Sequence, residues 1–519
     1  MVTTMGQGIV PALHHRRSHP AGFQRRNPAK ASHDPQMRQA MGVSLIALTL
    51  LMAGGIGGAF LVLRSPPDMF GGGCNLKSSF WPLGTLAICI AEVIQIASQK
   101  QGNSMPKHTF FLVPLALLAT AQPAAADTVS DWVEFANRVN SPLAPPPESR
   151  ARPDSGRATT RVALAMFEAL NAIDRRYESY VGMAQGDKTA SPDAAAITAA
   201  YRVLSDHFPS AKADLNDAYA IAMQAIPNDA NREAGRLIGE QAAKAALAVG
   251  GIDPNIVQIP YKPKTTPGVW TATDLPSTRP NSVAFYPWAI PNADSFRSPP
   301  PPAMTSERWA KDYDEVKRLG GKRSAERTPH QSLMAEYRIM PDISPSLRRT
   351  ADSAGRTLVQ NARMYARVYM AIDDSTMAMS AAKLYYDSWR PITAIRNGAA
   401  DGNDATVPDP AWESFLPTPN FPEHPCGHCA YAGSVAVVMI AEDGLKPSGG
   451  VRVTSRASPK AVVQILPNWD EWVQQVSDSR IYAGAHFRFA NEAGEAVGHA
   501  TGKSVLDKVM RPLPQTKPR

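Results

Sequence analysis

Four segments with helical spacing constrain the fold of this 519-residue chain more than any other feature. In residues 159–173 the apolar side chains recur every three to four positions, and the stretches 193–207, 212–226 and 229–249 are rich in alanine and contain no proline. Alanine favours helices more than any other residue, whereas proline disrupts their interiors. No segment alternates between apolar and polar residues for long enough to predict a strand. We therefore predict an all-α fold built as a helical bundle.

The second half of the chain also has helical patterns. They predict helices over residues 305–319, from about 351 to Trp389, from Gly427 to about Ala441, and over roughly 480–509. The second of these should end at Arg390-Pro391, because a residue that precedes proline avoids the helical conformation. We expect an N-terminal helical part, 127–350, and a catalytic part, 351–510.

A proline-rich segment, residues 251–304, separates these helical regions. It contains twelve of the chain's 46 prolines, which rules out regular helix across it. Four large aromatic residues lie within it, and they can anchor it to a core: Trp270, Phe285, Tyr286 and Trp288. We therefore expect a long, ordered loop that wraps around the helices and not a linker between domains.

The net charge of +8 invites a nucleic-acid or membrane-surface partner, but its location argues against both. Residues 1–104 hold nine Lys or Arg and three Asp or Glu, whereas residues 127–519 hold 44 basic and 43 acidic side chains. Residues 127–519 are thus nearly neutral, and a basic patch that binds phosphodiesters is not expected. We predict a small-molecule substrate, no nucleic-acid partner, and contact with a membrane only through the leader if it stays uncleaved.

The leader contains two candidate targeting segments. Residues 105–126 begin with Lys107 and His108, continue with an apolar run and end in three alanines before Asp127, which is the pattern of a secretory signal peptide. Residues 41–63 are 23 uncharged, mostly apolar residues, long enough for a transmembrane helix. Because a cleavable signal after a membrane span makes little sense, we expect residues 1–104 to be an over-extended N-terminus. The mature protein would be periplasmic or secreted, or membrane-anchored if residues 1–104 are real.

Three short segments carry the residues suited to chemistry. The first, KLYYDSWRP, contains Lys383 and Arg390, which on a continuous helix would lie two turns apart on one face. The second, FPEHPCGHCAYAG (residues 421–433), places His428 in the first turn of a predicted helix, whose free N–H groups attract anions. The third, SRIYAGAHFRFA, contains Arg480 and His486, which can share a helix face approximately. Each segment alone is weak evidence for a site.

Together, and in this order, the three segments resemble the phosphate-binding signature of the vanadium-dependent haloperoxidase and type-2 phosphatidic acid phosphatase superfamily. The stretch from about 130 to 510, including FRSPPPPAMTSERWAKDYDEVKRLG and WRPITAIRNG, is similar to the bacterial haloperoxidase-type branch. The resemblance implies a helical bundle of the haloperoxidase or acid phosphatase type. No set of apolar spans surrounds the motifs, which makes the small membrane-embedded lipid phosphatases a poorer match.

The resemblance also implies a role for each residue. Oxyanion ligands would be Lys383, Arg390, Arg480, Cys426 and the backbone N–H of Gly427. His486 would be the apical vanadium ligand of a haloperoxidase or the nucleophile of a phosphatase, and His428 the general acid or base. Phe421 would line the pocket. These groups suit the shared task of holding the equatorial oxygens of a phosphate or vanadate while an imidazole stands at one apex.

Two positions depart from the family pattern. Cys426 stands where the family usually has Ser, and a thiol is a weaker hydrogen-bond donor than a hydroxyl. Ala490 stands where the family usually has an Asp, four residues after the last His, that orients the imidazole. Loss of such a partner typically lowers activity about 10–100-fold. Asn491 or Glu492 are the candidates to replace it.

Two further motifs are weaker. The tetrapeptide Cys426-Gly-His-Cys429 is that of disulfide isomerases, but a thioredoxin-like site requires a preceding strand and a βαβ context, so a structural or regulatory disulfide is the better interpretation. Ser455-Arg456 resembles the start of the third motif, but no His follows at the required distance.

Three functions remain open from the sequence. The first is a vanadium-dependent haloperoxidase that uses vanadate as cofactor and oxidises a halide with hydrogen peroxide. The second is an acid phosphatase that needs no cofactor and hydrolyses phosphomonoesters through a phosphohistidine at His486. The third is an inactive oxyanion-binding homologue. Chain size and the haloperoxidase-type flanks favour the first.

Overall fold

The computed structural model describes residues 127–140, 154–255, 261–273, 284–457 and 462–514. From residue 127 onward the described chain belongs to one compact unit. The predicted membrane span 41–63 and the signal peptide 105–126 lie outside the described residues. No helix within the described ranges combines the length and the apolar character needed to cross a membrane.

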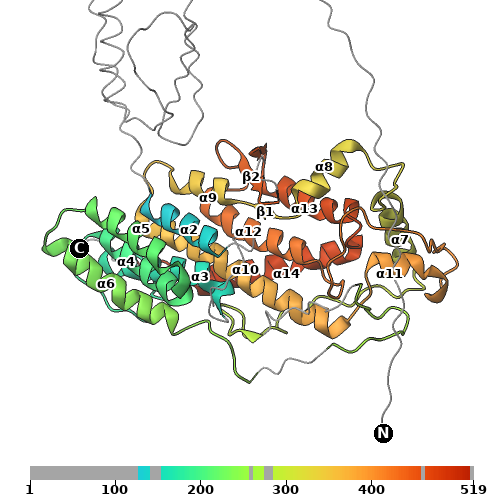
Figure 1. Cartoon of the computed structure of the whole chain (residues 1–519), viewed down its shortest axis with the longest axis horizontal. Helices are drawn as coiled ribbons and strands as arrows, with labels where there is room; N and C mark the ends of the chain where they lie inside the picture. Colours follow the sequence, from blue (N-terminus) through green and yellow to red (C-terminus); the bar gives the residue numbers. More distant parts are fainter. Residues whose placement is uncertain (1–126, 141–153, 256–260, 274–283, 458–461, 515–519) are drawn as a thin grey trace, which may run out of the picture. The chain divides into compact units, whose positions relative to one another are not determined.

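Helices packed around α3 form the first part of the described chain (Figure 1). They are α2 (Thr128–Val139), α3 (Ala158–Ile173), α4 (Pro192–His207), α5 (Lys212–Gln224) and α6 (Ala230–Leu247). All residues of α3 are buried, because α2, α4, α6 and α10 (Leu358–Tyr386) surround it. Its small alanines allow these neighbours to approach closely, as the helical spacing of this region predicts.

A second group of helices follows, and α10 contacts both groups (Figure 1). Its members are α7 (Glu307–Leu319), α8 (Pro329–Tyr337), α9 (Ser344–Ala351), α11 (Pro391–Arg396), α12 (Gly427–Asp443), α13 (Trp469–Tyr482) and α14 (Arg488–Lys508). Helices α12 and α14 pack against each other very closely. A Cβ atom added to Gly494 would lie 2.3 Å from the carbonyl oxygen of Cys426, so only glycine permits this approach.

Most predicted helices are confirmed, but two have the wrong ends. The helix predicted from about 351 to Trp389 is interrupted: α9 ends at Ala351, and α10 begins after Thr357, which caps it with its side chain. Helix α10 ends at Tyr386, since Asp387 adopts a left-handed conformation with φ 47°. The helices α2, α8, α9 and α11 were not among those predicted.

The helix predicted over 480–509 covers only the end of α13 and then α14, and most of α13 was not predicted. Gly484 separates them with φ +73°, and a Cβ atom there would meet the carbonyl oxygen of Gly320 at 2.4 Å. The connection therefore requires glycine. Because it contains His486, the predicted sharing of a helix face by Arg480 and His486 is wrong.

A small antiparallel sheet corrects the expectation that no strand would form. Its strands are β1 (Pro341–Asp342), β2 (Val451–Ser455) and β3 (Gln464–Leu466), in the order β1-β2-β3. Side chains of β2 alternate between buried and half-buried positions, but only over five residues. A pattern this short does not distinguish a strand from a loop. Ser455, in the second weak motif, lies in this sheet.

The described parts of the proline-rich loop lie along helix α10 and are hydrogen-bonded to it. Trp270 and Trp288 are buried, as expected of anchors, whereas Tyr286 is 45% exposed and does not act as one. The backbone N–H of Trp270 donates to the carbonyl oxygen of Asp387 at 2.6 Å, just after α10. The backbone N–H of Trp288 donates to the side chain of Asp374 within α10 at 2.8 Å. The loop is thus fastened to the middle and to the end of this helix.

Candidate oxyanion-binding site

Five side chains from five places in the chain meet at the end of α10. Lys383 is in its last turn, Arg390 caps the start of α11, His428 is in the first turn of α12, Arg480 is in the last turn of α13, and His486 lies between α13 and α14. Arg390 Nη1 lies 3.1 Å from His486 Nε2, and Arg480 Nη1 lies 3.3 Å from His428 Nε2. The structure therefore brings together all five residues that the sequence singled out.

Lys383 and Arg390 do not reach this place from one helix face, as we expected. Helix α10 ends between them, and Arg390 adopts an extended conformation before Pro391. Carbonyl groups of the segment 421–423 hold both cations. Lys383 Nζ donates to the carbonyl oxygens of Pro422 at 3.0 Å and Glu423 at 2.6 Å, and Arg390 Nε donates to that of Phe421 at 2.8 Å. These bonds fix the two cationic groups before any ligand binds.

Phe421 contacts the same two cations with its ring. Lys383 Nζ lies 5.4 Å and Arg390 Cζ 4.8 Å from the ring centroid. Both distances are within the range of cation–π attraction. The predicted pocket-lining residue thus also stabilises the positive charges beside it.

Glu423 is the residue that sequence analysis missed. Its side chain is fully buried, and its Oε1 atom lies 2.8 Å from His486 Nδ1 and accepts the backbone N–H of Phe487 at 3.1 Å. Burial raises the pKa of Glu423 to about 7, while the charges of Lys383 and Arg390 oppose this rise. The carboxyl group that orients the imidazole therefore comes from the second motif instead of from the position four residues after His486.

The two replacements proposed from the sequence do not take this role. Asn491 Nδ2 donates to the carbonyl oxygen of Ser477, and Glu492 is exposed and pairs with Arg308. Ala490 contributes its backbone, because its carbonyl oxygen accepts the N–H of Cys426 at 2.8 Å. In the sequence, Glu423 stands out as the one acidic residue of the second segment, FPEHPCGHCAYAG.

The contact with Glu423 determines which ring nitrogen of His486 carries the proton. A carboxylate only accepts hydrogen bonds, so Nδ1 carries the proton and Nε2 keeps its lone pair. Burial, followed by the charges of Arg390 and Lys383, lowers the pKa of His486 well below its usual range and favours the neutral imidazole. A neutral imidazole whose Nε2 carries no proton can ligate a metal centre or attack phosphorus with that nitrogen.

His428 is a second neutral imidazole at the same place. Its Nε2 atom lies 3.0 Å from the carbonyl oxygen of Ile339, an acceptor, which places the ring proton on this nitrogen. Burial and the neighbouring Arg480 lower the pKa of His428 to about 3. With its proton directed to Ile339, His428 offers Arg480 no lone pair at Nε2.

The site holds more positive charge than its own carboxylate can balance. Within the described ranges Glu423 is the one acidic residue that favours the charged forms of Lys383 and Arg390, and none pairs with Arg480. Burial lowers the pKa of Arg390 and of Arg480 to about 10 and that of Lys383 well below its usual range. Buried cations are unfavourable unless they are paired, which makes this site a candidate for an external anion.

Unpartnered donors point to the same conclusion. Arg390 Nη2, Arg480 Nε and Arg480 Nη2 are buried and have no hydrogen-bond partner among the described residues. Such groups are rare in folded proteins and demand an explanation. An oxyanion among them would accept the hydrogen bonds and balance the charge.

A disulfide joins Cys426 and Cys429 beside this site. Cys426 precedes α12, and its sulfur accepts the backbone N–H of Cys429 at 3.2 Å, as a helix cap. In the disulfide Cys426 has no S–H group, so its side chain cannot donate a hydrogen bond to an oxyanion as predicted. Gly427 begins α12, as predicted, so its N–H is among those a helix leaves free.

Comparison with known proteins agrees with this arrangement. Residues 363–515, which include all the residues of the site, match the family model of the VCPO second helical-bundle domain. These residues therefore resemble the vanadium-dependent haloperoxidase superfamily, as the three segments predict. No curated protein sequence matches it.

Solved structures of bacterial proteins have the same fold. A structure described as the first bacterial vanadium-dependent iodoperoxidase superposes with a TM-score of 0.55 at 19% identity, over 75% of this chain and 96% of the other. The apo and holo forms of a bacterial vanadium-dependent chloroperoxidase each give a TM-score of 0.53, at 18% and 17% identity. They cover 67% and 73% of this chain and 91% of their own length. The likeness thus includes nearly the whole of each relative.

Proposed function

We propose that this protein is a vanadate-dependent haloperoxidase that oxidises a halide with hydrogen peroxide. One observation carries the proposal: buried, unpartnered guanidinium N–H groups of Arg390 and Arg480 lie beside a neutral His486, whose unprotonated Nε2 is 3.1 Å from Arg390 Nη1. A tetrahedral oxyanion with a metal at its centre satisfies both, because its oxygens accept hydrogen bonds while the metal accepts the imidazole nitrogen. Bound vanadate would supply a Lewis acid that binds and polarises hydrogen peroxide.

The protein's own residues have distinct tasks in this proposal. Lys383, Arg390 and Arg480 hold the oxygens and balance their charge. Glu423 keeps the proton of His486 on Nδ1, so that Nε2 faces the anion. His428, which is only partly buried, is the candidate to accept a proton from incoming peroxide at Nδ1, because its Nε2 proton is directed to the carbonyl of Ile339.

Acid phosphatase activity is the second candidate. The same cations suit a phosphoryl group, and the unprotonated Nε2 of His486 serves as a nucleophile as well as it serves as a ligand. An inactive oxyanion-binding homologue is the third. The bacterial relatives described as haloperoxidases favour the first candidate over these two.

One assay with three outcomes separates the candidates. The purified protein is incubated with vanadate, hydrogen peroxide and bromide, and in parallel with an aryl phosphate in the presence and absence of vanadate. Bromination that requires vanadate supports the proposal. Phosphate release that vanadate inhibits overturns it in favour of a phosphatase, and silence in both arms overturns it in favour of the inactive homologue.

A matched pair of histidine variants tests the assignment of His486. His486→Ala should reduce the activity to background, because it removes the Nε2 atom that would ligate the metal. His330→Ala, which changes an exposed histidine of α8, should keep normal turnover. Normal turnover of His486→Ala would remove His486 from its role.

We also propose that the protein is exported, on the basis of the signal-peptide pattern in residues 105–126. Mass spectrometry of the mature protein from its native host tests this. A chain that begins at Asp127 is expected, and a retained leader would contradict export by cleavage.

A further inference from the structure

A methionine of α10 reaches the oxyanion site from the side. Met379 precedes Lys383 by four residues, so the two side chains lie on one face of the helix. The far end of Met379 meets the start of α12, because a Cβ atom added to Gly427 would lie 3.1 Å from Met379 Cε and 3.6 Å from its Sδ. The thioether thus contacts the residue whose N–H is expected to hold the anion.

The surroundings of Met379 leave its sulfur next to the reachable part of the site. The side chain is 9% exposed and packs in an apolar cluster that includes Ile290 and Met377. Gly427 and His428, in contrast, are half-buried, so small molecules can approach the first turn of α12. A small oxidant that forms there lies beside the thioether of Met379, whereas Met377 is only 1% exposed and is shielded.

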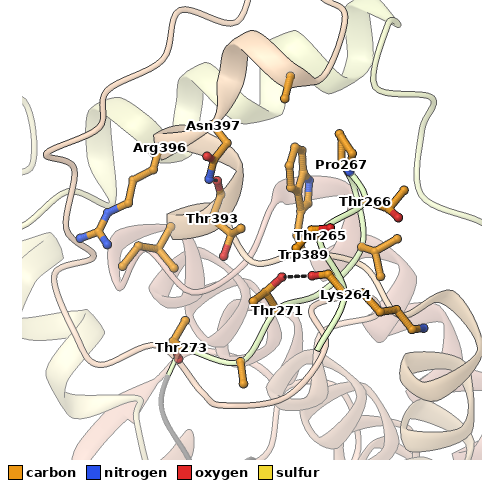
Figure 2. A pocket seen from close by; sticks show the side chains of 14 residues that line it. Lys264, Thr265, Thr266, Pro267, Thr271, Thr273, Trp389, Thr393, Arg396 and Asn397 are labelled. Carbon is orange, nitrogen blue, oxygen red and sulfur yellow. Dashed lines mark hydrogen bonds between the residues drawn. The ribbon is translucent and has the colours of Figure 1, made fainter. Parts of the chain in front are cut away.

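A cavity between the proline-rich loop and α11 is a separate feature (Figure 2). Loop residues 264–273 and residues 389–400 line it. The lining contains no residue of the oxyanion site and no sulfur atom. An oxidant that enters this cavity therefore finds no thioether in its walls, in contrast to one that forms at Gly427.

We propose that Met379 is a site of self-oxidation: hypobromous acid formed at the oxyanion site converts its thioether to the sulfoxide, and the sulfoxide weakens anion binding. The inference rests on the proposed function, which supplies this oxidant from bromide, hydrogen peroxide and a proton. Oxidation turns an apolar methionine side chain into a polar one and disturbs the contacts around it.

The oxidation balances without a further reagent. The sulfur lone pair attacks bromine, the O–Br bond breaks, and hydroxide leaves. The oxygen of a water molecule then forms a bond to sulfur, and the S–Br bond breaks to release bromide. One of the two protons of this water joins the hydroxide, and the other goes to solvent. Sulfur loses two electrons, and bromine gains them.

The sulfoxide competes with the anion for hydrogen-bond donors. Its oxygen is an acceptor, and Gly427, the residue that the Met379 thioether contacts, begins a helix whose first N–H groups are free. Because the sulfoxide is neutral, it occupies a donor without balancing the charge of Lys383, Arg390 and Arg480. Vanadate affinity should therefore fall roughly tenfold, as for the loss of other groups that support a ligand.

The order in which methionines are oxidised tests the first step. The vanadate-loaded protein receives bromide and limiting hydrogen peroxide, and peptide mass spectrometry locates the sulfoxides. Met379 should react roughly fivefold faster than Met223, a half-buried methionine of α5, because the oxidant forms beside Met379. Hypobromous acid added to protein without vanadate should reverse this order, since Met223 is more exposed. Faster oxidation of Met223 during turnover, or the same order in both arms, overturns the proposal.

Variants test the second step. Met379→Leu keeps the volume without the sulfur and should start with a halide oxidation rate within about twofold of the wild type. After the same turnover and removal of peroxide, isothermal titration should show the loss of vanadate affinity in the wild type and in Met223→Leu, but not in Met379→Leu. An equal loss in Met379→Leu overturns the proposal. The mass spectrometry of the wild type needs no variant, so a folding defect in Met379→Leu does not hide the answer.

Bromination of phenol red in the same reactions keeps failures distinguishable. If the wild type brominates the dye while Met379 stays a thioether, the inference falls and the proposed function stands. If the wild type brominates nothing, the proposed function falls and the self-oxidation falls with it. Excess hypobromous acid added to the wild type and to Met379→Leu then decides whether the sulfoxide weakens anion binding, and equal vanadate affinities overturn that step as well.

Discussion

Helix α10 carries two buried clusters of charged residues, and they differ in how their charges are balanced. The anchoring cluster, in the first half of the bundle, consists of Asp154, Arg157, Arg161, Asp373 and Asp374. The oxyanion site, at the end of the helix, consists of Lys383, Arg390, Glu423, Arg480 and His486. The first cluster has three carboxyl groups for two guanidinium groups, whereas the second has one carboxyl group for three cations.

Hydrogen bonding shows the same difference. In the anchoring cluster Arg161 pairs with Asp154 at 2.5 Å and donates to the carbonyl oxygen of Val249 at 2.9 Å. Asp374 accepts three backbone N–H groups of the proline-rich loop at 2.7 to 3.1 Å. No nitrogen of Arg157 or Arg161 is left buried without a partner, in contrast to Arg390 and Arg480. A buried charge that serves structure is satisfied within the fold, and one that serves binding is left for the ligand.

The strongest test of this contrast compares two arginine-to-methionine changes. Arg161→Met should lower the free energy of unfolding by about 3–5 kcal/mol, because it removes the buried guanidinium group that pairs with Asp154. Arg480→Met should leave it unchanged within about 1 kcal/mol in buffer free of phosphate and vanadate, because no carboxylate loses a partner. Urea denaturation of both variants measures the difference. Similar losses in the two variants would break the comparison.

Vanadate binding at the oxyanion site should raise the free energy of unfolding of the protein, and this increase should depend on the residues of that site. Vanadate at 100 times its Kd should raise the free energy of unfolding by about 2.7 kcal/mol. The increase should be absent in Arg480→Met and present in Arg202→Met, which changes an exposed arginine of α4. A thermal-shift titration in both variants gives the answer, and an equal response of the two would place the anion elsewhere.

Replacement of Glu423 should have an intermediate effect. Glu423→Gln keeps the volume but no longer offers a carboxylate to His486 Nδ1, so vanadate affinity should fall about 10–100-fold. Glu492→Gln, which changes the acidic residue nearest in sequence to position 490, should bind vanadate normally. Isothermal titration with vanadate measures both affinities. A greater loss in Glu492→Gln would return the orienting role to the third motif.

The smallest effect is expected from Phe421. Phe421→Leu removes a cation–π contact to Lys383 and Arg390 and should lower stability by about 1 kcal/mol and weaken vanadate binding. Phe415→Leu removes a similar contact, with Arg327 Cζ 3.9 Å from the ring centroid, outside the site. It should lower stability without changing vanadate affinity. A vanadate affinity unchanged by Phe421→Leu would limit Phe421 to packing.

Local patterns were enough to predict most of the bundle. The segments of α3, α4, α5, α6 and α12 have helical spacing or alanine-rich, proline-free sequence, and these features act over a few residues. The end of α10 and the division of α13 from α14 depend on left-handed residues, Asp387 and Gly484, whose conformations follow from contacts far away in sequence. The strands of the small sheet are too short to have a pattern.

The sequence identified five of the residues that meet at the end of α10, but it missed Glu423 and the contacts between them. Order and spacing of the motifs identified Lys383, Arg390, His428, Arg480 and His486. The hydrogen bond from His486 to Glu423 joins residues 63 positions apart, and no local pattern reports such a contact. A family expectation directed attention to Ala490, where the backbone alone contributes.

The close approach of Gly494 in α14 to Cys426, just before α12, affects how an anion can bind. With Gly494 pressed against the carbonyl of Cys426, the turn that presents Gly427 has no room to shift when an anion arrives. A site this rigid needs little reorganisation when an anion binds. Its affinity therefore depends on how well the charges match, and its rate of binding depends on how easily the anion reaches it. Gly494→Ala would force the two helices apart and loosen that turn, so slower, weaker capture of the anion is the expected signature.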